Sequence, residues 1–215
     1  MGSWCGAAAD RVASRAVVRA TLPFPFGPAV PTFPAMSVVR QNIVLIGFMG
    51  SGKSSVGRRV ATLLGFKFVD TDAVLVEREG REIAEIFASE GEERFRDLES
   101  AALASLKSLA GCVISTGGGV ILREKNRALL RALGCVVWLT ASEDTLFARV
   151  SRTNKRPLLQ TADPRATVAA LSTARRPLYA EAAQFTLDTT TFSHAEAAEA
   201  VVAEARRVFS WDTPG

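Results

Sequence analysis

The sequence has no apolar run long enough to cross a membrane, only three cysteines and only one histidine. A membrane-spanning helix requires about 20 consecutive apolar residues, so we expect no membrane partner. Cys5, Cys112 and Cys135 form no C-x-x-C pair, and a sparse, odd count favours a reducing compartment over a disulfide framework. Cys112 and Cys135 each open an apolar run, which predicts buried thiols.

Runs of like charge are also missing. The 215 residues include 26 Lys and Arg and 22 Asp and Glu, which gives a formal net charge of +4. Basic residues are interleaved with acidic ones and few aromatic residues could stack on bases, so no nucleic-acid partner is predicted. A mildly positive balance equally suits an enzyme that binds polyanionic small molecules. With 48% hydrophobic residues, the chain can form one compact α/β domain.

Residues 1–35 differ in composition from the rest. They hold one acidic residue, the arginines Arg11, Arg15 and Arg19 at helical spacing, and then five prolines. Proline neither continues a helix nor joins a central strand, so we expect a disordered extension outside the folded domain, which spans 36–215. The segment resembles an organellar transit peptide, which would indicate a plastid protein. The alternative, that Met36 is the true start of a cytoplasmic protein, is the one we favour.

Residues 47–54, Gly-Phe-Met-Gly-Ser-Gly-Lys-Ser, match the pattern G-x-x-x-x-G-K-[ST] in full. An apolar run precedes them, and residues 55–64 follow with apolar positions at helical spacing. A strand, a glycine-rich turn and a helix N-terminus together form an anion cradle of backbone N–H groups. A turn that merely joins a strand to a helix is the alternative, and the full match with suitable flanks argues against it. We therefore expect the chain to bind a nucleoside triphosphate.

Within this phosphate-binding loop, or P-loop, each residue type has an expected role. Lys53 would reach the β- and γ-phosphates, and the Ser54 hydroxyl would help to hold Mg²⁺. The remaining nucleotide contacts are expected from Gly50, Ser51, Gly52 and Ser55.

From residue 40 onward, strand-like runs alternate with helical patterns, which is typical of a parallel sheet with helices on both faces. The predicted strands are 42–47, 67–70, 111–115, 135–139 and 184–188. We therefore predict an α/β P-loop three-layer sandwich with a five-stranded parallel sheet. A long helical region should break near Gly91, and the last helix should open at Ser193 with Glu196 completing a capping box. Residues 151–164 are polar and turn-rich, and form a candidate lid.

Six motifs carry a family resemblance, in order and in spacing. They are residues 47–54, 68–72 (Phe-Val-Asp-Thr-Asp), 90–96 (Glu-Gly-Glu-Glu-Arg-Phe-Arg), 116–119 (Thr-Gly-Gly-Gly), 156–159 (Arg-Pro-Leu-Leu) and 174–179 (Ala-Arg-Arg-Pro-Leu-Tyr). From about residue 42 to residue 209 the chain resembles shikimate kinase, a small P-loop kinase related in fold to nucleoside monophosphate kinases. The resemblance implies ATP-dependent phosphorylation of the 3-hydroxyl of shikimate, with Mg²⁺, in aromatic amino acid biosynthesis. We expect a monomer whose partners are ATP and shikimate.

The motif 68–72 ends the second predicted strand, so Asp70 and Asp72 would both project at the carboxyl edge of the sheet, on the same face. The third strand has no terminal Asp, so Asp70 is the available metal-orienting carboxylate, a role that the resemblance implies. Asp72 would then contact the acceptor hydroxyl and accept its proton. The alternative for this pair is a helix N-terminal cap.

A carboxylated substrate favours arginine, which makes bidentate contacts. The resemblance places Arg96 and Arg175 on the shikimate carboxylate. The alternative is that they are surface arginines paired with carboxylates such as Glu92, Glu93 or Glu99. Arg175 begins an Arg-Arg-Pro run where we expect a helix to close. Close approach of the backbone to the substrate ring would be possible at Gly117, Gly118 and Gly119, although a flexible turn would read the same.

Arg156, in the candidate lid, would neutralise charge on the phosphate oxygens during transfer. The resemblance implies that Arg149 lies near the adenine, but Arg149, Arg152 and Arg156 are close enough to exchange these roles. His194 falls within the last helix cap and is a poor candidate for a base. Two other functions stay open: another small-molecule P-loop kinase such as a gluconate kinase, and a catalytically inactive binding or regulatory module. The presence of Lys53, Asp70, Asp72 and Arg156 argues against the second.

Overall fold

The computed structural model describes residues 42–151 and 161–209. The expectations for residues 1–35 and Met36, for most of the candidate lid, and for Arg152 and Arg156 therefore lie outside the described residues. Pro164, the last residue of that candidate lid, is the first residue of a helix.

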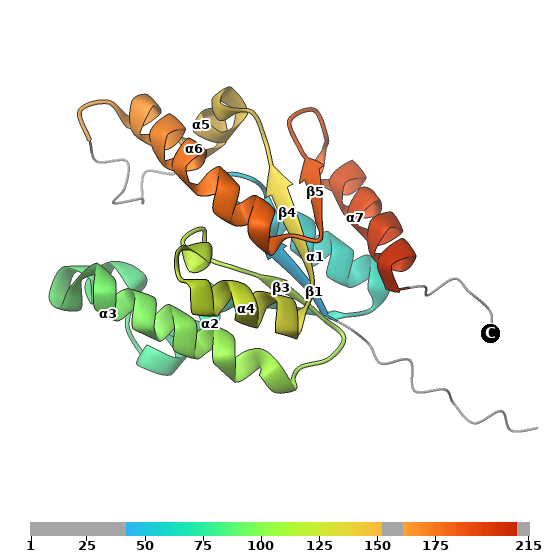
Figure 1. The fold of residues 1–215 in the computed structure, drawn as a ribbon, viewed down its shortest axis with the longest axis horizontal. Helices are drawn as coiled ribbons and strands as arrows, with labels where there is room; N and C mark the ends of the chain where they lie inside the picture. The colour runs from blue at the N-terminus through green and yellow to red at the C-terminus, as the bar shows by residue number, and fades with distance from the viewer. Residues whose placement is uncertain (1–41, 152–160, 210–215) are drawn as a thin grey trace, which may run out of the picture. The chain divides into compact units, whose positions relative to one another are not determined.

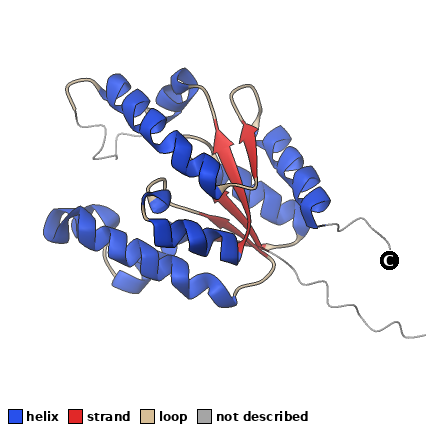
Figure 2. Ribbon diagram, viewed as in Figure 1, coloured by secondary structure: helices blue, strands red, loops and turns tan. Residues whose placement is uncertain are grey.

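The sheet has five strands in the order β2-β3-β1-β4-β5, and every pair is parallel (Figure 2). The strands are β1 Asn42–Ile46, β2 Lys67–Asp70, β3 Cys112–Ser115, β4 Gly134–Thr140 and β5 Phe185–Asp188. Each predicted strand is confirmed to within one residue at either end. Because all strands point the same way, their carboxyl ends meet at one edge, where open α/β sheets bind ligands.

Seven α-helices and two 3₁₀ turns connect or flank the strands in the described ranges. The helices are α1 Lys53–Leu64, α2 Thr71–Glu79, α3 Ile83–Ser105, α4 Glu124–Leu133, α5 Glu143–Val150, α6 Pro164–Ala182 and α7 His194–Phe209, and the turns are η1 Leu106–Ser108 and η2 Val120–Leu122. Helices α1 and α7 cover one face of the sheet, while α4 and α6 lie on the other with α2 and α3 packed beside them (Figure 1). The predicted sandwich is confirmed.

The central strand β1 shows why both faces must be covered. Its side chains alternate, so Ile43 and Leu45 join the core with α1 and α7, whereas Val44 and Ile46 join the core with α4 and α6. All four are fully buried, as expected for a parallel sheet enclosed on both sides. The P-loop thus starts from a strand that is buried on both faces and paired on both edges.

Local signals in the helices had mixed outcomes. Gly91 breaks α3 as predicted, with φ 80°, a conformation that favours glycine. The Ser193–Glu196 capping box is confirmed, since the Glu196 N–H donates to Ser193 Oγ at 3.2 Å and the Ser193 N–H donates to Glu196 Oε2 at 2.8 Å. The predicted helix end at Arg-Arg-Pro is wrong, because α6 continues through Pro177 to Ala182. Burial of Tyr179 and Ala182 outweighs the hydrogen bond that proline removes.

Cys112 and Cys135 are buried and unpaired, as predicted. Across the described ranges, no helix combines the length and the apolar character that crossing a membrane would require.

Candidate active site

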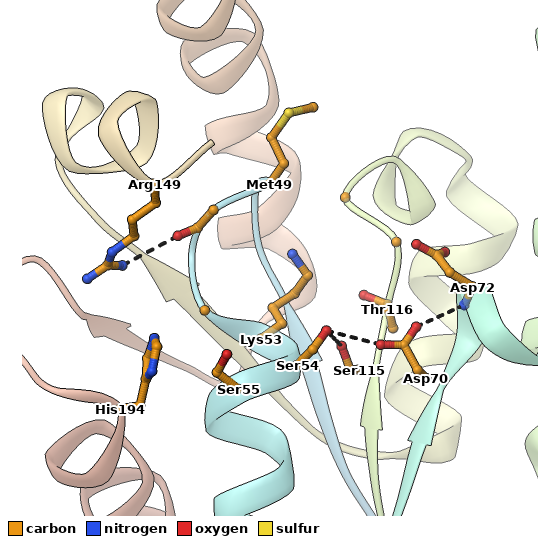
Figure 3. Close-up of a pocket in the computed structure, with 14 residues that line it drawn as sticks. Met49, Lys53, Ser54, Ser55, Asp70, Asp72, Ser115, Thr116, Arg149 and His194 are labelled. Atoms are coloured by element: carbon orange, nitrogen blue, oxygen red, sulfur yellow. Dashed lines mark hydrogen bonds between the residues drawn. The ribbon is translucent and has the colours of Figure 1, made fainter. Parts of the chain in front are cut away.

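A cleft of about 360 Å³ opens at the carboxyl edge of the sheet, over the P-loop. Ten of the residues singled out in the sequence line it: Gly50, Gly52, Lys53, Ser54, Ser55, Asp70, Asp72, Gly117, Gly118 and Arg149. Met49, Ser115, Thr116 and His194 complete the lining (Figure 3). Residues from the carboxyl ends of β2 and β3 and from α2, α5 and α7 thus meet around one phosphate-binding loop.

The P-loop leads directly into α1. Gly52 is the N-cap of this helix and has φ 93°, which a residue with a side chain rarely adopts. Lys53 is nearly buried, and its Nζ donates to the carbonyl oxygens of Gly47 at 2.8 Å and Phe48 at 3.0 Å. The ammonium group therefore already lies within the curve of the loop. Ser51 is buried and does not line the cleft, so the structure does not bring its side chain to this surface.

Asp70 connects three elements. Its Oδ2 accepts a hydrogen bond from Ser54 Oγ at 3.0 Å, and its Oδ1 accepts from the Asp72 N–H at 3.1 Å. The second bond caps α2, so the capping and cleft interpretations of Asp70 are both correct. Ser115, at the end of β3, lies 3.3 Å from the Ser54 hydroxyl. This arrangement of hydroxyl and carboxylate oxygens suits Mg²⁺, a hard cation that prefers oxygen ligands.

Asp72 reaches the cleft by a different route from the one predicted. Strand β2 ends at Asp70, and Asp72 lies in the first turn of α2, so strand alternation does not align the two carboxylates. The helix begins at Thr71 because Asp70 caps it. Both side chains nevertheless line the same cleft, as expected.

The glycine run 117–119 faces several charged groups closely. A Cβ atom built on Gly117 would lie 2.8 Å from Glu99 Oε1 and 2.9 Å from Asp72 Oδ1. A Cβ atom on Gly119 would collide with the Arg96 guanidinium. Side chains of this protein therefore lie close to the backbone at these glycines, and the approach of a substrate ring stays a prediction. Gly119, Arg96 and Arg175 do not themselves line the cleft over the P-loop.

Arg96 is a buried residue rather than a surface one, yet it does pair with carboxylates. It donates to Glu92 Oε1 at 2.9 Å and to Glu99 Oε2 at 3.1 Å. Sequence reasoning named Glu99 only as a surface partner, whereas its side chain is 2% exposed and its other oxygen has no hydrogen-bond partner among the described residues. Burial raises the pKa of the Glu99 carboxyl against the opposing effect of Arg96. Arg96 and Glu99 are three positions apart on a helix, and this spacing could have predicted their ion pair from the sequence.

Arg175, the other arginine predicted to bind the substrate carboxylate, is also buried. Its Nη1 lies 3.4 Å from the Gly118 carbonyl oxygen, which Tyr179 Oη reaches at 2.6 Å. Arg96 and Arg175 thus approach the glycine run at Gly119 and at Gly118, from α3 and α6. Two buried guanidinium groups next to backbone that lines the cleft could bind a carboxylate there.

The opposite end of the cleft is formed by Arg149 and His194, which lie on the far side of the P-loop from Asp70 and Asp72 (Figure 3). Arg149 donates to the carbonyl oxygens of Gly50 at 3.4 Å and Thr189 at 3.0 Å. The His194 ring lies 3.7 Å from the Cβ position of Gly52. Sequence reasoning considered His194 only as a base, and it missed this position because the chain must fold to bring α7 to the P-loop.

Comparisons with known proteins agree with this geometry. The shikimate kinase family model matches residues 49–206. A shikimate kinase of Thermodesulfovibrio yellowstonii is 45% identical over 173 residues, which cover 80% of this chain and 99% of that protein.

Among solved structures, a shikimate kinase of Acinetobacter baumannii in complex with shikimate has a TM-score of 0.75 and 36% identity, covering 81% of this chain and 96% of that one. A shikimate kinase of Bacteroides thetaiotaomicron has a TM-score of 0.70 and 28% identity, over 79% and 98% of the two chains. From the family match and these similarities, the chain belongs to the shikimate kinase family.

Proposed function

We propose that this protein transfers the γ-phosphoryl group of ATP to the 3-hydroxyl of shikimate, giving 3-phosphoshikimate and ADP. The observation that carries this proposal is the convergence of Asp72, Arg96 and Arg175 on the glycine run 117–119, beside the P-loop. A base for a hydroxyl and two cations for a carboxylate are the groups that a hydroxylated acid requires. Family membership supports the same activity.

The nucleotide would lie along the cleft with its phosphates in the P-loop. Lys53 Nζ would move from the Gly47 and Phe48 carbonyls to the β- and γ-phosphates. The carboxylates of Asp70 and Asp72 occupy one end of the cleft. The adenine of the nucleotide would therefore extend toward the other end, between Arg149 and His194. This direction agrees with the role proposed for Arg149 near the adenine.

Mg²⁺ would be held by Ser54 Oγ and, directly or through water, by Asp70, whose oxygen is 3.0 Å from that hydroxyl. The ion would supply charge neutralisation on the phosphate oxygens. Such a site draws most of its ligands from phosphates and water, so two protein groups are enough. Ser115 is close enough to orient the Ser54 hydroxyl.

At the acceptor end, Asp72 would take the proton of the attacking hydroxyl as that oxygen bonds to the γ-phosphorus and the bond to the ADP oxygen breaks. Asp72 Oδ1 already lies close to Gly117, which lines the cleft. Arg96 and Arg175 would orient shikimate through its carboxylate, which requires Arg96 to share its contacts with Glu92 and Glu99. The role of Arg156 on the transferring phosphoryl group stays a prediction from the resemblance.

The arrangement disfavours the two alternatives. An inactive binding module would not need Lys53, Ser54, Asp70 and Asp72 together in one cleft. A gluconate kinase would bind a different, open-chain acid, and the family match is to shikimate kinase. The monomeric state and the cytoplasmic location stay predictions. The test of the function is ADP release from ATP by the purified chain, measured with shikimate, with gluconate and without an acceptor. Release should be fast only when shikimate is the acceptor.

A further inference from the structure

The carbonyl oxygen of Gly118 marks the point where α6 meets the acceptor end of the cleft. Tyr179 Oη donates to it at 2.6 Å, a short and strong geometry for a hydroxyl donor, and Arg175 Nη1 approaches it at 3.4 Å. Arg175 and Tyr179 lie one helical turn apart, because α6 continues through Pro177. One face of this helix therefore presents two groups to the same peptide: Arg175, which would bind the substrate carboxylate, and the Tyr179 hydroxyl.

Tyr179 is held rigidly. Its side chain is 1% exposed, and its ring stacks on Trp138 of β4 with centroids 5.7 Å apart. Burial raises the pKa of the Tyr179 hydroxyl, so the group keeps its proton and remains a donor over the whole working pH range. A packed ring with a hydroxyl that always donates is suited to holding the Gly118 peptide in one orientation.

The P-loop also lies next to Gly118. A Cβ atom built on Gly118 would lie 3.5 Å from both Gly47 O and Met49 N. Since the peptide group is planar, holding the Gly118 carbonyl also fixes the direction of the Gly119 N–H. Asp72 lies beside Gly117 and Arg96 beside Gly119, each so close that a Cβ atom added to the glycine would collide with it. The orientation of this one peptide therefore affects the spacing of the acceptor groups from the phosphate-binding loop.

We infer that Tyr179 is a positioning residue for the acceptor: its hydroxyl fixes the Gly118 peptide and thereby aligns the groups around the glycine run with the P-loop. The inference rests on the proposed function. Tyr179 itself touches no reacting atom in this account, since it acts through Gly118 and beside Arg175. A tyrosine that served only to fill the core would need its ring but not its hydroxyl.

The variant Tyr179→Phe separates these two roles, because it keeps the ring and removes the hydroxyl. We expect the KM for shikimate to rise about three- to tenfold, the range for loss of one net hydrogen bond, with the KM for ATP unchanged. The control is Asn42→Ala, which removes hydrogen bonds to Leu109 O and Leu133 O at the opposite edge of the sheet. It should lower the Tm without changing either KM. An unchanged KM for shikimate in Tyr179→Phe would overturn the inference.

A second measurement needs no substitution, because Tyr179 is the single tyrosine of the chain. Protein labelled with 3-fluorotyrosine should give one ¹⁹F resonance that shifts on titration with shikimate, even if Tyr179→Phe fails to fold. A resonance that stays in place at saturating shikimate contradicts the inference. If the unaltered protein shows no shikimate-dependent ADP release, the proposed function fails, whereas normal activity without these effects overturns the role of Tyr179 alone.

Discussion

The Ser54 hydroxyl donates to Asp70 Oδ2 at 3.0 Å, which ties the first turn of α1 to the end of β2. The same carboxylate caps α2 through the Asp72 N–H, so one residue sets the distance between the P-loop and the predicted base. This relationship makes Asp70 a structural as well as a metal-binding candidate, and it separates the expected effects of substituting Asp70 and Asp72.

Asp72→Asn keeps the shape of the side chain but removes its ability to accept a proton. We expect kcat to fall by ~10²-fold or more, the lower range for loss of a general base, with little change in ATP binding. Asp70→Asn should instead raise the Mg²⁺ concentration needed for half-maximal rate. The measurement is a Mg²⁺ titration of initial rates at saturating shikimate. A shift in Mg²⁺ requirement for Asp72→Asn, with none for Asp70→Asn, would mean that the roles are reversed.

Substitutions beside the glycine run 117–119 and at the Arg149 end of the cleft should affect different substrates. Arg96→Lys keeps the charge but loses the bidentate geometry, so the KM for shikimate should rise and the KM for ATP should not. Arg96→Ala removes the whole guanidinium group. It should lower kcat/KM for shikimate by the equivalent of roughly 1.5–3 kcal/mol, as for loss of a hydrogen bond to a charged group.

His194→Ala provides the mirror image of this experiment. It removes a ring from the end of the cleft beside Arg149, so the KM for ATP should rise while the KM for shikimate stays constant. Steady-state kinetics with each substrate varied in turn distinguishes the two patterns. Equal effects of either variant on both substrates would indicate general structural damage rather than a divided cleft.

Glu99 predicts a pH dependence of stability. Its pKa in the folded protein is raised, chiefly by burial, with Arg96 opposing and the nearby Asp72 reinforcing the shift. A raised folded-state pKa stabilises the protein below the unfolded value, near 4.5, and this contribution is lost as pH rises through the folded value.

The free energy of unfolding of the unaltered protein should therefore fall relative to that of Glu99→Gln as pH rises from 4.5 toward neutrality. Urea unfolding of both proteins, without ligand, measures the difference. A difference that is constant with pH would show that the Arg96 ion pair offsets burial, and one that grows in favour of the unaltered protein would show that the ion pair outweighs burial.

The local parts of this molecule were predictable from the sequence, since each rests on a short motif. The P-loop between β1 and α1, the break at Gly91 and the Ser193–Glu196 capping box all depend on residues within a few positions of each other. Runs of apolar residues likewise located all five strands.

The parts that failed or were missed depend on tertiary packing. The end of α6 was misplaced because burial of Tyr179 overrides the proline signal. The orientation of Asp72 was predicted from strand alternation, although Asp72 lies in the first turn of a helix that Asp70 caps. Glu99 and His194 gain their positions from contacts made by α3 and α7 with distant loops. The residues next to Glu99 and His194 in the sequence do not indicate that these side chains lie beside the glycine run and the P-loop.

The most direct test of the account is acceptor-dependent ADP release, with the product identified by ³¹P and ¹H NMR. The unaltered protein should release ADP with shikimate and not with gluconate or without acceptor, and the phosphate should be on the 3-oxygen. Lys53→Met, which should keep the fold but lose the phosphate contact, serves as the control and should be inactive. Release of ADP that does not depend on shikimate, or a folded Lys53→Met protein with near-normal transfer, would contradict the account.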